Sequence, residues 1–534
     1  MEKLDCFKAY DVRGRVPDQL NEAVARRIGR AYAEVVKPRK VVVGHDIRLT
    51  SEAIKAALAD GLREQGVDVY DIGLCGTEEI YFATSHAQMD GGIVVTASHN
   101  PKDFNGMKFV REESRPISGD SGLAEIRALA EANRFTRAAT HGRYLPLDTS
   151  AAYIEHLLSY VDVATLPPLR IVVDAGNGGA GRVVDLLAPH LPFEFVRLHH
   201  EPDGHFPNGV PNPLLQENRA VTSAAVLAEG ADLGLAWDGD FDRCFFFDER
   251  GEFVEGYYLV GLLAEMALEQ HPGAAIIHDP RLVWNTIDRV QKLGGRAVES
   301  KTGHAFIKER MRAENAAYGG EMSAHHYFRD FAFCDSGMIP WLLVAAQLGR
   351  RGMPLSALVA ECMAAFPCSG EINRSVDDPA AVLAKVATRY RPQALEESSV
   401  DGLSMAVCGL ALQSSSVEHG TRGAFERGKP RRCRPDEDAD QRLAGADRCL
   451  AGCGSLCCRL CPEPFGNQAF AGRVQRLVCR GLVQALQNAL ADILAQLHAP
   501  LIEGVHAPQL AAAEGTVFIP VSYTHLRAHE TTSH

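Results

Sequence analysis

One pattern, in which a short apolar strand is followed by a helix and a second strand, begins three times in this chain. Strands that alternate with helices in this way form parallel sheets with helices on both faces. The predicted strands lie at 40–44, 67–73, 93–95, 169–174, 193–198 and 274–279, and the predicted helices lie at 51–65, 182–187, 285–293 and 305–311. We therefore expect three α/β domains in series whose strand-end loops face a shared cleft.

Two stretches without apolar periodicity, 140–146 and 248–252, are the expected linkers between these units. A Thr50/Ser51 pair stands at the start of the helix predicted at 51–65, where a hydroxyl can cap the first turn. With 534 residues, the chain is long enough for roughly three to four domains.

The composition is that of a globular protein and excludes several functional classes. Apolar residues make up 46% and charged residues 23% of the chain, as is usual for proteins with a large core. The first residues are charged and no apolar segment follows them, so we expect no secretory signal. No run approaches the ~18 apolar residues of a membrane span. A net charge of −13 argues against a broad nucleic-acid surface, so we expect a cytoplasmic protein without nucleic-acid or membrane partners.

The loop that follows the strand at 93–95 presents a single hydroxyl, that of Ser98. Small and turn-forming residues end the strand, and His99, Lys102 and Lys108 lie close in sequence. Loops held by a rigid strand often present reactive side chains, although an isolated segment of this kind is more often a capped turn. A second loop, much later in the chain, favours the reactive interpretation because it supplies the chemistry that such a serine needs.

That second loop contains three aspartates at alternating positions, Asp238, Asp240 and Asp242. Gly239 permits a tight bend, and carboxylates at this spacing suit a hard divalent cation such as Mg²⁺. A calcium-binding EF-hand is the alternative, but its twelfth position would be Glu249 and helices should flank it, whereas strands are predicted here. A solvated acidic turn fits poorly between apolar strands. The loop is therefore a predicted magnesium site.

Two further loops are weaker evidence of function when each is taken alone. The segment 319–326 offers Glu321 and Ser323, a carboxylate and a hydroxyl that can bind neighbouring sugar hydroxyls. The segment 176–181 fits G-x-G-x-x-G between a strand and a helix, with Glu194 in the next strand, as in dinucleotide-binding domains. An NAD-type oxidoreductase is thus an alternative, but nothing else resembles hydride-transfer machinery. A glycine-rich turn is the favoured interpretation.

Five motifs in a fixed order form a resemblance to a known family. They lie at 7–14, 96–101, 238–243, 301–304 and 320–325. Together they are similar to the α-D-phosphohexomutases, most closely to the bacterial phosphomannomutases. The resemblance implies four domains around a cleft and conversion of mannose 6-phosphate to mannose 1-phosphate through a mannose or glucose 1,6-bisphosphate, for GDP-mannose and surface polysaccharide synthesis. The alternatives are a phosphoglucomutase, and a catalytically silent binding protein that Ser98→Ala would leave unchanged.

The resemblance assigns roles to single residues. Ser98 becomes the phosphoserine that gives and receives the phosphoryl group, and the implied Mg²⁺ ligands are Ser98, Asp238, Asp240 and Asp242. The implied catalytic residues are Ser98, Arg13, Lys108 and His304, the last two as candidates for proton movement. The implied substrate-binding residues are Tyr10, Arg243, Arg281, Glu321, Ser323 and His325. The expected partner is a small-molecule sugar phosphate, and the expected state is a monomer or weak dimer.

The domain bounds that follow from the linkers and the resemblance place one functional loop in each unit. They are 1–138 with the phosphoserine loop, 148–250 with the metal-binding loop, 253–363 with the sugar-binding loop, 364–406 as the start of a fourth domain, and 407–534 as an aberrant tail.

The resemblance stops near Ala406. The family's fourth domain has a phosphate-binding loop such as R-S-S-N-T-E-P, and no such loop follows Met405. Codons can be chosen for 418–432 that, read one base later, encode N-T-E-P-V-V-R-L-N-V-E-S-R-G. We therefore hypothesise a frameshift near Ala406 that removes the grip on the substrate's non-reacting phosphate and leaves weak or absent activity. DNA with incompatible codons would refute this hypothesis.

The tail beyond that point has a composition of its own, with eight of the 14 cysteines. A zinc site is the rival interpretation, drawn from Cys449, Cys453, Cys457, Cys458 and Cys461. Only Cys458 and Cys461 have C-x-x-C spacing, so the paired elements of a zinc ribbon or finger are missing. The stretch 520–529 resembles translated adapter sequence. We expect neither segment to have a defined fold.

Overall fold

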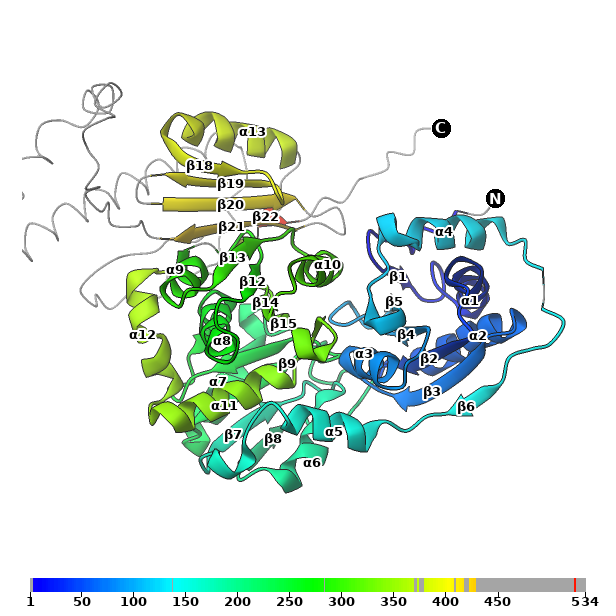
Figure 1. Cartoon of the computed structure of the whole chain (residues 1–534), viewed down its shortest axis with the longest axis horizontal. Helices are drawn as coiled ribbons and strands as arrows, with labels where there is room; N and C mark the ends of the chain where they lie inside the picture. Colours follow the sequence, from blue (N-terminus) through cyan, green and yellow to red (C-terminus); the bar gives the residue numbers. More distant parts are fainter. Residues whose placement is uncertain are drawn as a thin grey trace, which may run out of the picture.

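The structure is a computed structural model that describes residues 3–136, 138–282, 284–368, 372–373, 379–407, 410–416, 422–428 and 523–524. The described residues form four sheets in chain order. Figure 1 shows the first unit (blue) beside the third (green), with the second (cyan to teal) below the third and the fourth (yellow) above it. The first three units confirm the predicted series of α/β domains.

The first domain contains a sheet with both parallel and antiparallel strands. Its elements are β1 (Val12–Arg15), α1 (Glu22–Val36), β2 (Lys40–His45), α2 (Ser51–Glu64), β3 (Asp68–Leu74), α3 (Thr77–His86), β4 (Gly91–Val95), β5 (Phe104–Arg111), α4 (Leu123–Ala132) and β6 (Tyr144–Pro146). The strand order is β1-β5-β4-β2-β3-β6, in which β5 runs antiparallel to β1 and β4. The predicted linker at 140–146 is therefore wrong in part, because its end pairs with β3 as the edge strand β6.

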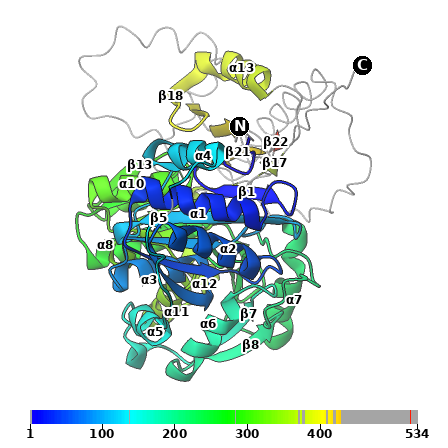
Figure 2. The same ribbon diagram turned by 90° about the vertical axis from the view of Figure 1, so that its right-hand side faces the viewer.

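Helices α1 and α2 pack against each other on one face of this sheet (Figure 2). A Cβ atom on Gly29 would lie 2.3 Å from the carbonyl oxygen of Leu58. One on Gly61 would lie 2.2 Å from the carbonyl oxygen of Arg26. Only glycine permits helix backbones to approach this closely. The close helix pair supports the sheet from which the Ser98 loop projects.

The second domain has a five-stranded sheet that ends in a meander. Its elements are α5 (Ser150–Leu158), β7 (Arg170–Asp174), α6 (Ala180–Leu187), β8 (Glu194–Leu198), α7 (Ala220–Glu229), β9 (Leu233–Trp237), β10 (Cys244–Phe247) and β11 (Phe253–Val254). The order is β11-β10-β9-β7-β8. The predicted linker at 248–252 is wrong, because these residues form the turn between β10 and β11. The carboxylate of Asp248 accepts hydrogen bonds from the backbone N–H groups of Arg250 and Glu252, both at 3.0 Å, and so fixes that turn.

The third domain repeats the α/β pattern, and most residues of its helix α8 are buried. Its elements are α8 (Gly256–Gln270), β12 (Ala275–His278), α9 (Trp284–Lys292), β13 (Arg296–Glu299), α10 (His304–Glu314), β14 (Tyr318–Gly320), β15 (His326–Phe328), β16 (Cys334–Asp335), α11 (Ile339–Arg351) and α12 (Leu355–Ala365). The strand order is β13-β12-β14-β15-β16. The helices predicted at 285–293 and 305–311 correspond to α9 and α10.

A fourth sheet follows and lies next to β13 in Figure 1. Its elements are β17 (Ile372–Asn373), α13 (Pro379–Tyr390), β18 (Ala394–Ser398), β19 (Leu403–Val407), β20 (Leu410–Ser416), β21 (Arg422–Gly428) and β22 (Tyr523–Thr524). The order is β17-β21-β20-β19-β18, and β22 pairs with β21. The sequence predicts no strand after 407. The candidate zinc cysteines at 449–461 lie outside the described residues, as do the rewritten segment 418–432 apart from β21 and the stretch 520–529 apart from β22.

Most predicted elements agree closely with the observed ones, and the start of α2 is an exception in detail. Thr50 makes no capping hydrogen bond. The Ser51 hydroxyl instead donates to the carboxylate of Asp46 at 2.5 Å. Of the described helices, none is both long and apolar enough to cross a membrane.

One of the four hydrophobic clusters among the described residues contains side chains of all three α/β domains, which are also joined by a buried carboxylate. Glu78, at the start of α3, accepts a hydrogen bond from the Ser336 hydroxyl at 2.9 Å and one from the N–H of Gly337 at 2.5 Å. The hydroxyl of Tyr153 in α5 also donates to Glu78. One side chain of the first domain thus binds both others, which holds the loops of the three domains in fixed positions.

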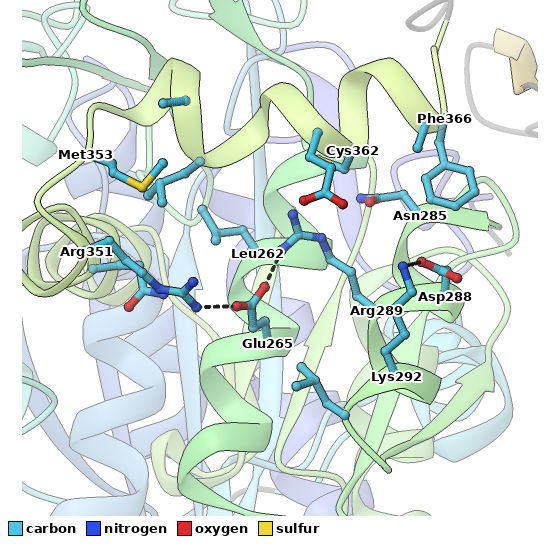
Figure 3. Close-up of a pocket in the computed structure, with 16 residues that line it drawn as sticks. Leu262, Glu265, Asn285, Asp288, Arg289, Lys292, Arg351, Met353, Cys362 and Phe366 are labelled. Carbon is cyan, nitrogen blue, oxygen red and sulfur yellow. Dashed lines mark hydrogen bonds and ion pairs between the residues drawn. The ribbon is translucent and has the colours of Figure 1, made fainter. Parts of the chain in front are cut away.

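A cleft of about 340 Å³ lies between α8, α9, α11 and α12 of the third domain (Figure 3). Glu265 pairs there with Arg289, and with Arg351 at 2.5 Å. Lys292 pairs with Asp288 at 2.7 Å. These charged groups neutralise one another, and the lining includes none of the predicted site residues.

Candidate active site

The Ser98 loop connects β4 with β5, and its first part, 96–98, is buried whereas 101–103 are exposed. Ser98 is 3% exposed and has φ = 47°, a left-handed conformation that costs a non-glycine residue on the order of 1 kcal/mol. Its N–H donates to the Thr96 hydroxyl at 3.0 Å. Its own hydroxyl donates to Asp238 Oδ2 at 2.6 Å and lies 3.1 Å from His99 Nδ1. The predicted reactive serine of the first domain therefore touches the predicted metal loop of the second.

The acidic loop forms the hairpin connection between β9 and β10, as the sequence predicts. Asp238, Asp240 and Asp242 are each at most 1% exposed. One oxygen of each, Oδ1, has no hydrogen-bond partner among the described residues. Ligand atoms of the three carboxylates lie within 4.8 Å of one another. Buried carboxylate oxygens without partners are what a hard divalent cation requires, so these residues fit Mg²⁺.

Lys108, on β5, neutralises part of this negative charge. Its Nζ donates to Asp240 Oδ2 at 2.8 Å and to Asp242 Oδ2 at 2.5 Å. The hydroxyls of Thr77 and Thr96 also donate to Asp240, at 2.6 and 3.0 Å. Burial alone would raise the pKa of Asp240, but Lys108 and these hydroxyls lower it below its usual range. Burial alone would lower the pKa of Lys108, but the two carboxylates raise it, so Lys108 stays charged.

Asp238 has a different electrostatic environment from its neighbours. Burial, together with the charges of Asp242 and Asp240, raises the pKa of Asp238 to about 7. Arg243 lies with its Nε 3.6 Å from Asp238 and 3.9 Å from Asp242. Lys108 and Arg243 thus lie on one side of the three carboxylates, whose Oδ1 atoms make no hydrogen bond within the described part of the chain and can face a further cation.

The glycine-rich turn between β7 and α6 packs against the acidic loop. A Cβ atom on Gly178 would lie 2.9 Å from the carbonyl oxygen of Gly239, and the N–H of Gly179 donates to the same oxygen at 3.2 Å. Gly181 approaches the backbone of His200, where a Cβ would lie 2.3 Å from the carbonyl oxygen. The glycines allow the turn to pack closely against the metal loop. This packing explains the G-x-G-x-x-G pattern without a bound dinucleotide.

The third domain contributes the predicted sugar-binding residues. Glu321 is 2% exposed, and it accepts hydrogen bonds from the Tyr327 hydroxyl and from the N–H of Gly303 at 3.2 Å. Arg281 pairs with Asp279 at 2.6 Å, and the same carboxylate accepts the N–H of Met322 at 2.9 Å. Two loops of this domain, 301–304 and 320–325, are thereby bound to each other, with Ser323 half-buried in the second.

Of the two predicted residues near the N-terminus, Tyr10 contacts the third domain. The rings of Tyr10 and His304 meet edge to face with centroids 5.0 Å apart. Arg13 pairs with Asp11 at 2.7 Å. Within the described part of the chain, neither ring nitrogen of His304 has a hydrogen-bond partner. Burial and the nearby Lys308 lower the pKa of His304 well below its usual range, so its imidazole is neutral.

Three models of one protein family match successive parts of this chain. They are the phosphoglucomutase/phosphomannomutase alpha/beta/alpha domains I, II and III, which match residues 5–137, 151–251 and 255–366. The chain belongs to the phosphoglucomutase/phosphomannomutase family. The matches to these models end at residue 366, before the fourth sheet, and the frameshift near Ala406 stays a prediction.

Relatives in this family are close and cover most of the chain. A phosphomannomutase of Salmonella montevideo is 59% identical over 427 residues, which are 78% of this chain and 94% of that protein. Phosphohexose mutases of Xanthomonas campestris pv. campestris are 61% identical over 421 residues, 78% of this chain and 93% of theirs. The structure of a family protein from Burkholderia thailandensis superposes with a TM-score of 0.72 at 32% identity, covering 80% of this chain and 94% of that one.

The structure also brings Asp335, Lys308 and Arg48 to the site, three residues that the sequence did not single out. His325 Nδ1 lies 2.9 Å from Asp335 and 3.8 Å from Asp242. Asp335 in turn pairs with Lys308 at 2.6 Å, and both are fully buried. Arg48 binds the Ser98 loop. Their positions in the sequence could have indicated them, because each lies next to a strand or a motif. Arg48 follows β2, Asp335 ends β16, and Lys308 follows the motif at 301–304.

The raised pKa of Asp238 gives the site of this family member a testable pH dependence. A carboxylate must be ionised to bind a metal, so a pKa of about 7 predicts that affinity for Mg²⁺ rises about tenfold from pH 6 to pH 8. Isothermal titration in buffers of different ionisation enthalpy should show proton release on binding below pH 7. Asp238→Asn should bind Mg²⁺ more weakly and without this pH dependence. Equal affinity at both pH values would contradict the prediction.

Proposed function

We propose that this chain is a phosphomannomutase, an isomerase that interconverts mannose 6-phosphate and mannose 1-phosphate. The observation that supports this most is the contact between Ser98 and Asp238, because it joins a reactive hydroxyl to carboxylates suited to a divalent cation. The Salmonella relative, 59% identical to this chain, is named a phosphomannomutase. The product would serve GDP-mannose and surface polysaccharide synthesis.

Charge neutralisation is the first task of the proposed site, since phosphoryl transfer requires mainly positioning and compensation of negative charge. Asp238, Asp240 and Asp242 would hold Mg²⁺ together with a phosphate on Ser98, and the ion supplies positive charge beside the phosphoryl oxygens. Lys108 remains protonated between two carboxylates. We therefore assign it the role of a fixed cation rather than that of a base.

Proton transfer is the second task, and His304 is the proposed base. The accepting sugar hydroxyl loses its proton as the bond from phosphorus to the sugar oxygen forms and the bond to Ser98 Oγ breaks. A neutral imidazole with unpartnered ring nitrogens can take that proton. The departing Ser98 Oγ takes up a proton from His99, whose Nδ1 lies 3.1 Å away. In the return transfer both protons move back: Ser98 Oγ bonds to phosphorus and gives its proton to His99, while the bond from phosphorus to the sugar oxygen breaks and that oxygen takes the proton held by His304.

Substrate binding is assigned to residues of the first and third domains. Glu321 and Ser323 are proposed to hydrogen-bond sugar hydroxyls, and Arg13, Arg281 and Arg243 to attract the phosphate groups. Tyr10 and His325 would line the rest of the substrate-binding cleft. The bisphosphate intermediate must turn over without loss of phosphate to water, which requires a site that excludes solvent. The burial of Ser98 and of the three aspartates supports this requirement.

The deciding experiment is a coupled assay with mannose 1-phosphate, in the presence of Mg²⁺ and a hexose 1,6-bisphosphate. A frame-restored version, in which residues after Ala406 are those encoded one base later, should turn over mannose 1-phosphate. The chain as given should be at least about 100-fold slower, because one end of the substrate has no clamp. Equal rates would contradict the expected consequence of the frameshift. No turnover by either version would refute the proposed function.

Glucose phosphates are the second candidate substrates, and one observation favours testing them. The Xanthomonas relatives, 61% identical, are named phosphohexose mutases rather than phosphomannomutases. Mannose and glucose differ only in the configuration at C2, so discrimination depends on a single hydroxyl. The ratio of kcat/KM for mannose 1-phosphate and glucose 1-phosphate, measured with the frame-restored version, decides between a specific and a dual enzyme.

A further inference from the structure

Arg48, in the loop after β2, is bound to the backbone of the Ser98 loop by all of its terminal nitrogens. The side chain is buried, with the residue 4% exposed. Its Nη1 donates to the carbonyl oxygens of Pro101 at 2.8 Å and Phe104 at 2.9 Å. Its Nη2 donates to those of Ser98 at 2.8 Å and Asn100 at 2.6 Å. One guanidinium group therefore donates hydrogen bonds to four backbone carbonyls in and next to the loop that bears the reactive serine.

This arrangement fixes the conformation of the loop. The planar fork of arginine directs several N–H groups at once, which the single nitrogen of lysine cannot do. Asp46 adds a second contact, because its carboxylate accepts the N–H of Ala97 at 3.4 Å and lies 3.5 Å from Arg48 Nε. The left-handed φ of Ser98 is thus held by contacts on both sides of the serine.

The same arginine also contacts the second domain. Its guanidinium carbon lies 5.3 Å from the centre of the Phe206 ring, within the range of a cation–π interaction. Gly204 packs so closely on this loop that a Cβ there would lie 2.3 Å from the carbonyl oxygen of Ile47. Phe206 is itself only 6% exposed. Arg48 therefore lies between the serine loop and the domain that carries the metal loop.

We propose that Arg48 is a positioning residue for phosphoryl transfer at Ser98. It holds the serine loop in shape and, through Phe206, in register with the metal-binding domain, so that the Ser98 hydroxyl stays within reach of Asp238. Its terminal nitrogens are used by backbone carbonyls, so it does not serve as a phosphate ligand. The inference rests on the proposed function, because it assumes that Ser98 receives a phosphoryl group.

The test is the rate at which Ser98 becomes phosphorylated in the frame-restored version mixed with mannose 1,6-bisphosphate and Mg²⁺, followed by intact mass. Arg48→Lys keeps the charge but not the four hydrogen bonds, and we expect phosphorylation about 100-fold slower, as for a reacting group displaced by about 1 Å. Its Mg²⁺ affinity should stay within about twofold of the unmodified chain, because the aspartates are untouched. Phe206→Leu is expected to slow phosphorylation by about tenfold with the same Mg²⁺ affinity, and it serves if Arg48→Lys does not fold.

A matched pair elsewhere in the first domain provides the control. Arg30 lies over the Phe135 ring at 5.8 Å and pairs with Glu64, without contact to the Ser98 loop. Arg30→Lys and Phe135→Leu should lower the melting temperature by a similar amount and leave the phosphorylation rate unchanged. A normal rate in Arg48→Lys, or equal slowing in the control pair, would overturn the inference while the function stands. Absence of phosphorylation in the frame-restored version without a substitution would refute the proposed function and the inference with it.

Discussion

Ser98→Ala is expected to lower kcat for mannose 1-phosphate by at least about 10⁴-fold, because no other described hydroxyl occupies its position beside the metal loop. The Ser98 hydroxyl contacts Asp238 at 2.6 Å, and alanine removes it, whereas the nearby hydroxyls of Thr77 and Thr96 are bound to Asp240 instead. The frame-restored version is the appropriate background, since its unmodified rate is measurable. The variant should also show no mass increase after incubation with mannose 1,6-bisphosphate.

A second buried serine makes a closely matched control for this substitution. Ser114 is also fully buried with a left-handed φ of 56°, and its hydroxyl donates one hydrogen bond, to the carbonyl oxygen of Tyr81 at 2.6 Å. Both Ser→Ala changes should lower the free energy of unfolding by about 1–3 kcal/mol, the usual effect of losing one buried hydrogen bond. Only Ser98→Ala should lose activity. Phosphorylation that persists in Ser98→Ala would place the reactive group elsewhere. A Ser98→Ala variant with no change in any measured property would support the alternative of a catalytically silent binding protein.

The sequence predicts the domains and the metal loop because both depend on short-range patterns. The apolar run of β9 and the three alternating aspartates are enough to place a carboxylate cluster at a strand end. The linker predicted at 140–146 is wrong in part because its end forms β6. This short edge strand has mostly exposed side chains and therefore no apolar alternation that the sequence could show. The Thr50/Ser51 cap failed because Ser51 is bound by Asp46, a partner that only the fold reveals.

The parts of the site that the sequence could not predict depend on contacts between distant segments. Arg48 lies 50 residues before Ser98, and no local pattern indicates that one guanidinium binds four carbonyls of another loop. The charge state of Lys108 likewise follows from Asp240 and Asp242, which lie 132 and 134 residues further along the chain. Motif spacing therefore indicates which residues react, whereas the electrostatics of the site require the fold.

The ion pair of Lys308 and Asp335 is the second feature whose removal should have a large effect. Both side chains are 0% exposed, with Nζ and Oδ1 2.6 Å apart. The ammonium group also lies 3.6 Å from the centre of the Tyr81 ring, which belongs to α3 of the first domain. Burial alone would raise the pKa of Asp335, but Lys308 and His325 lower it well below its usual value of 3.8. The carboxylate therefore stays ionised and needs its partner.

Lys308→Met should lower the free energy of unfolding in urea by about 3–5 kcal/mol, since it leaves the Asp335 charge buried with His325 alone. Lys292→Met is the control, because Lys292 pairs with Asp288 at 2.7 Å but is 68% exposed, and surface pairs contribute about 0–1 kcal/mol. Asp335→Asn in the Lys308→Met background should recover part of the loss, because the double change leaves no unpaired charge. The contribution of Asp335 is present above pH 3.8, its unfolded value, and is lost as the pH falls towards its lower folded pKa. A Lys308→Met chain as stable as the Lys292→Met control would show that the buried pair does not stabilise the folded chain.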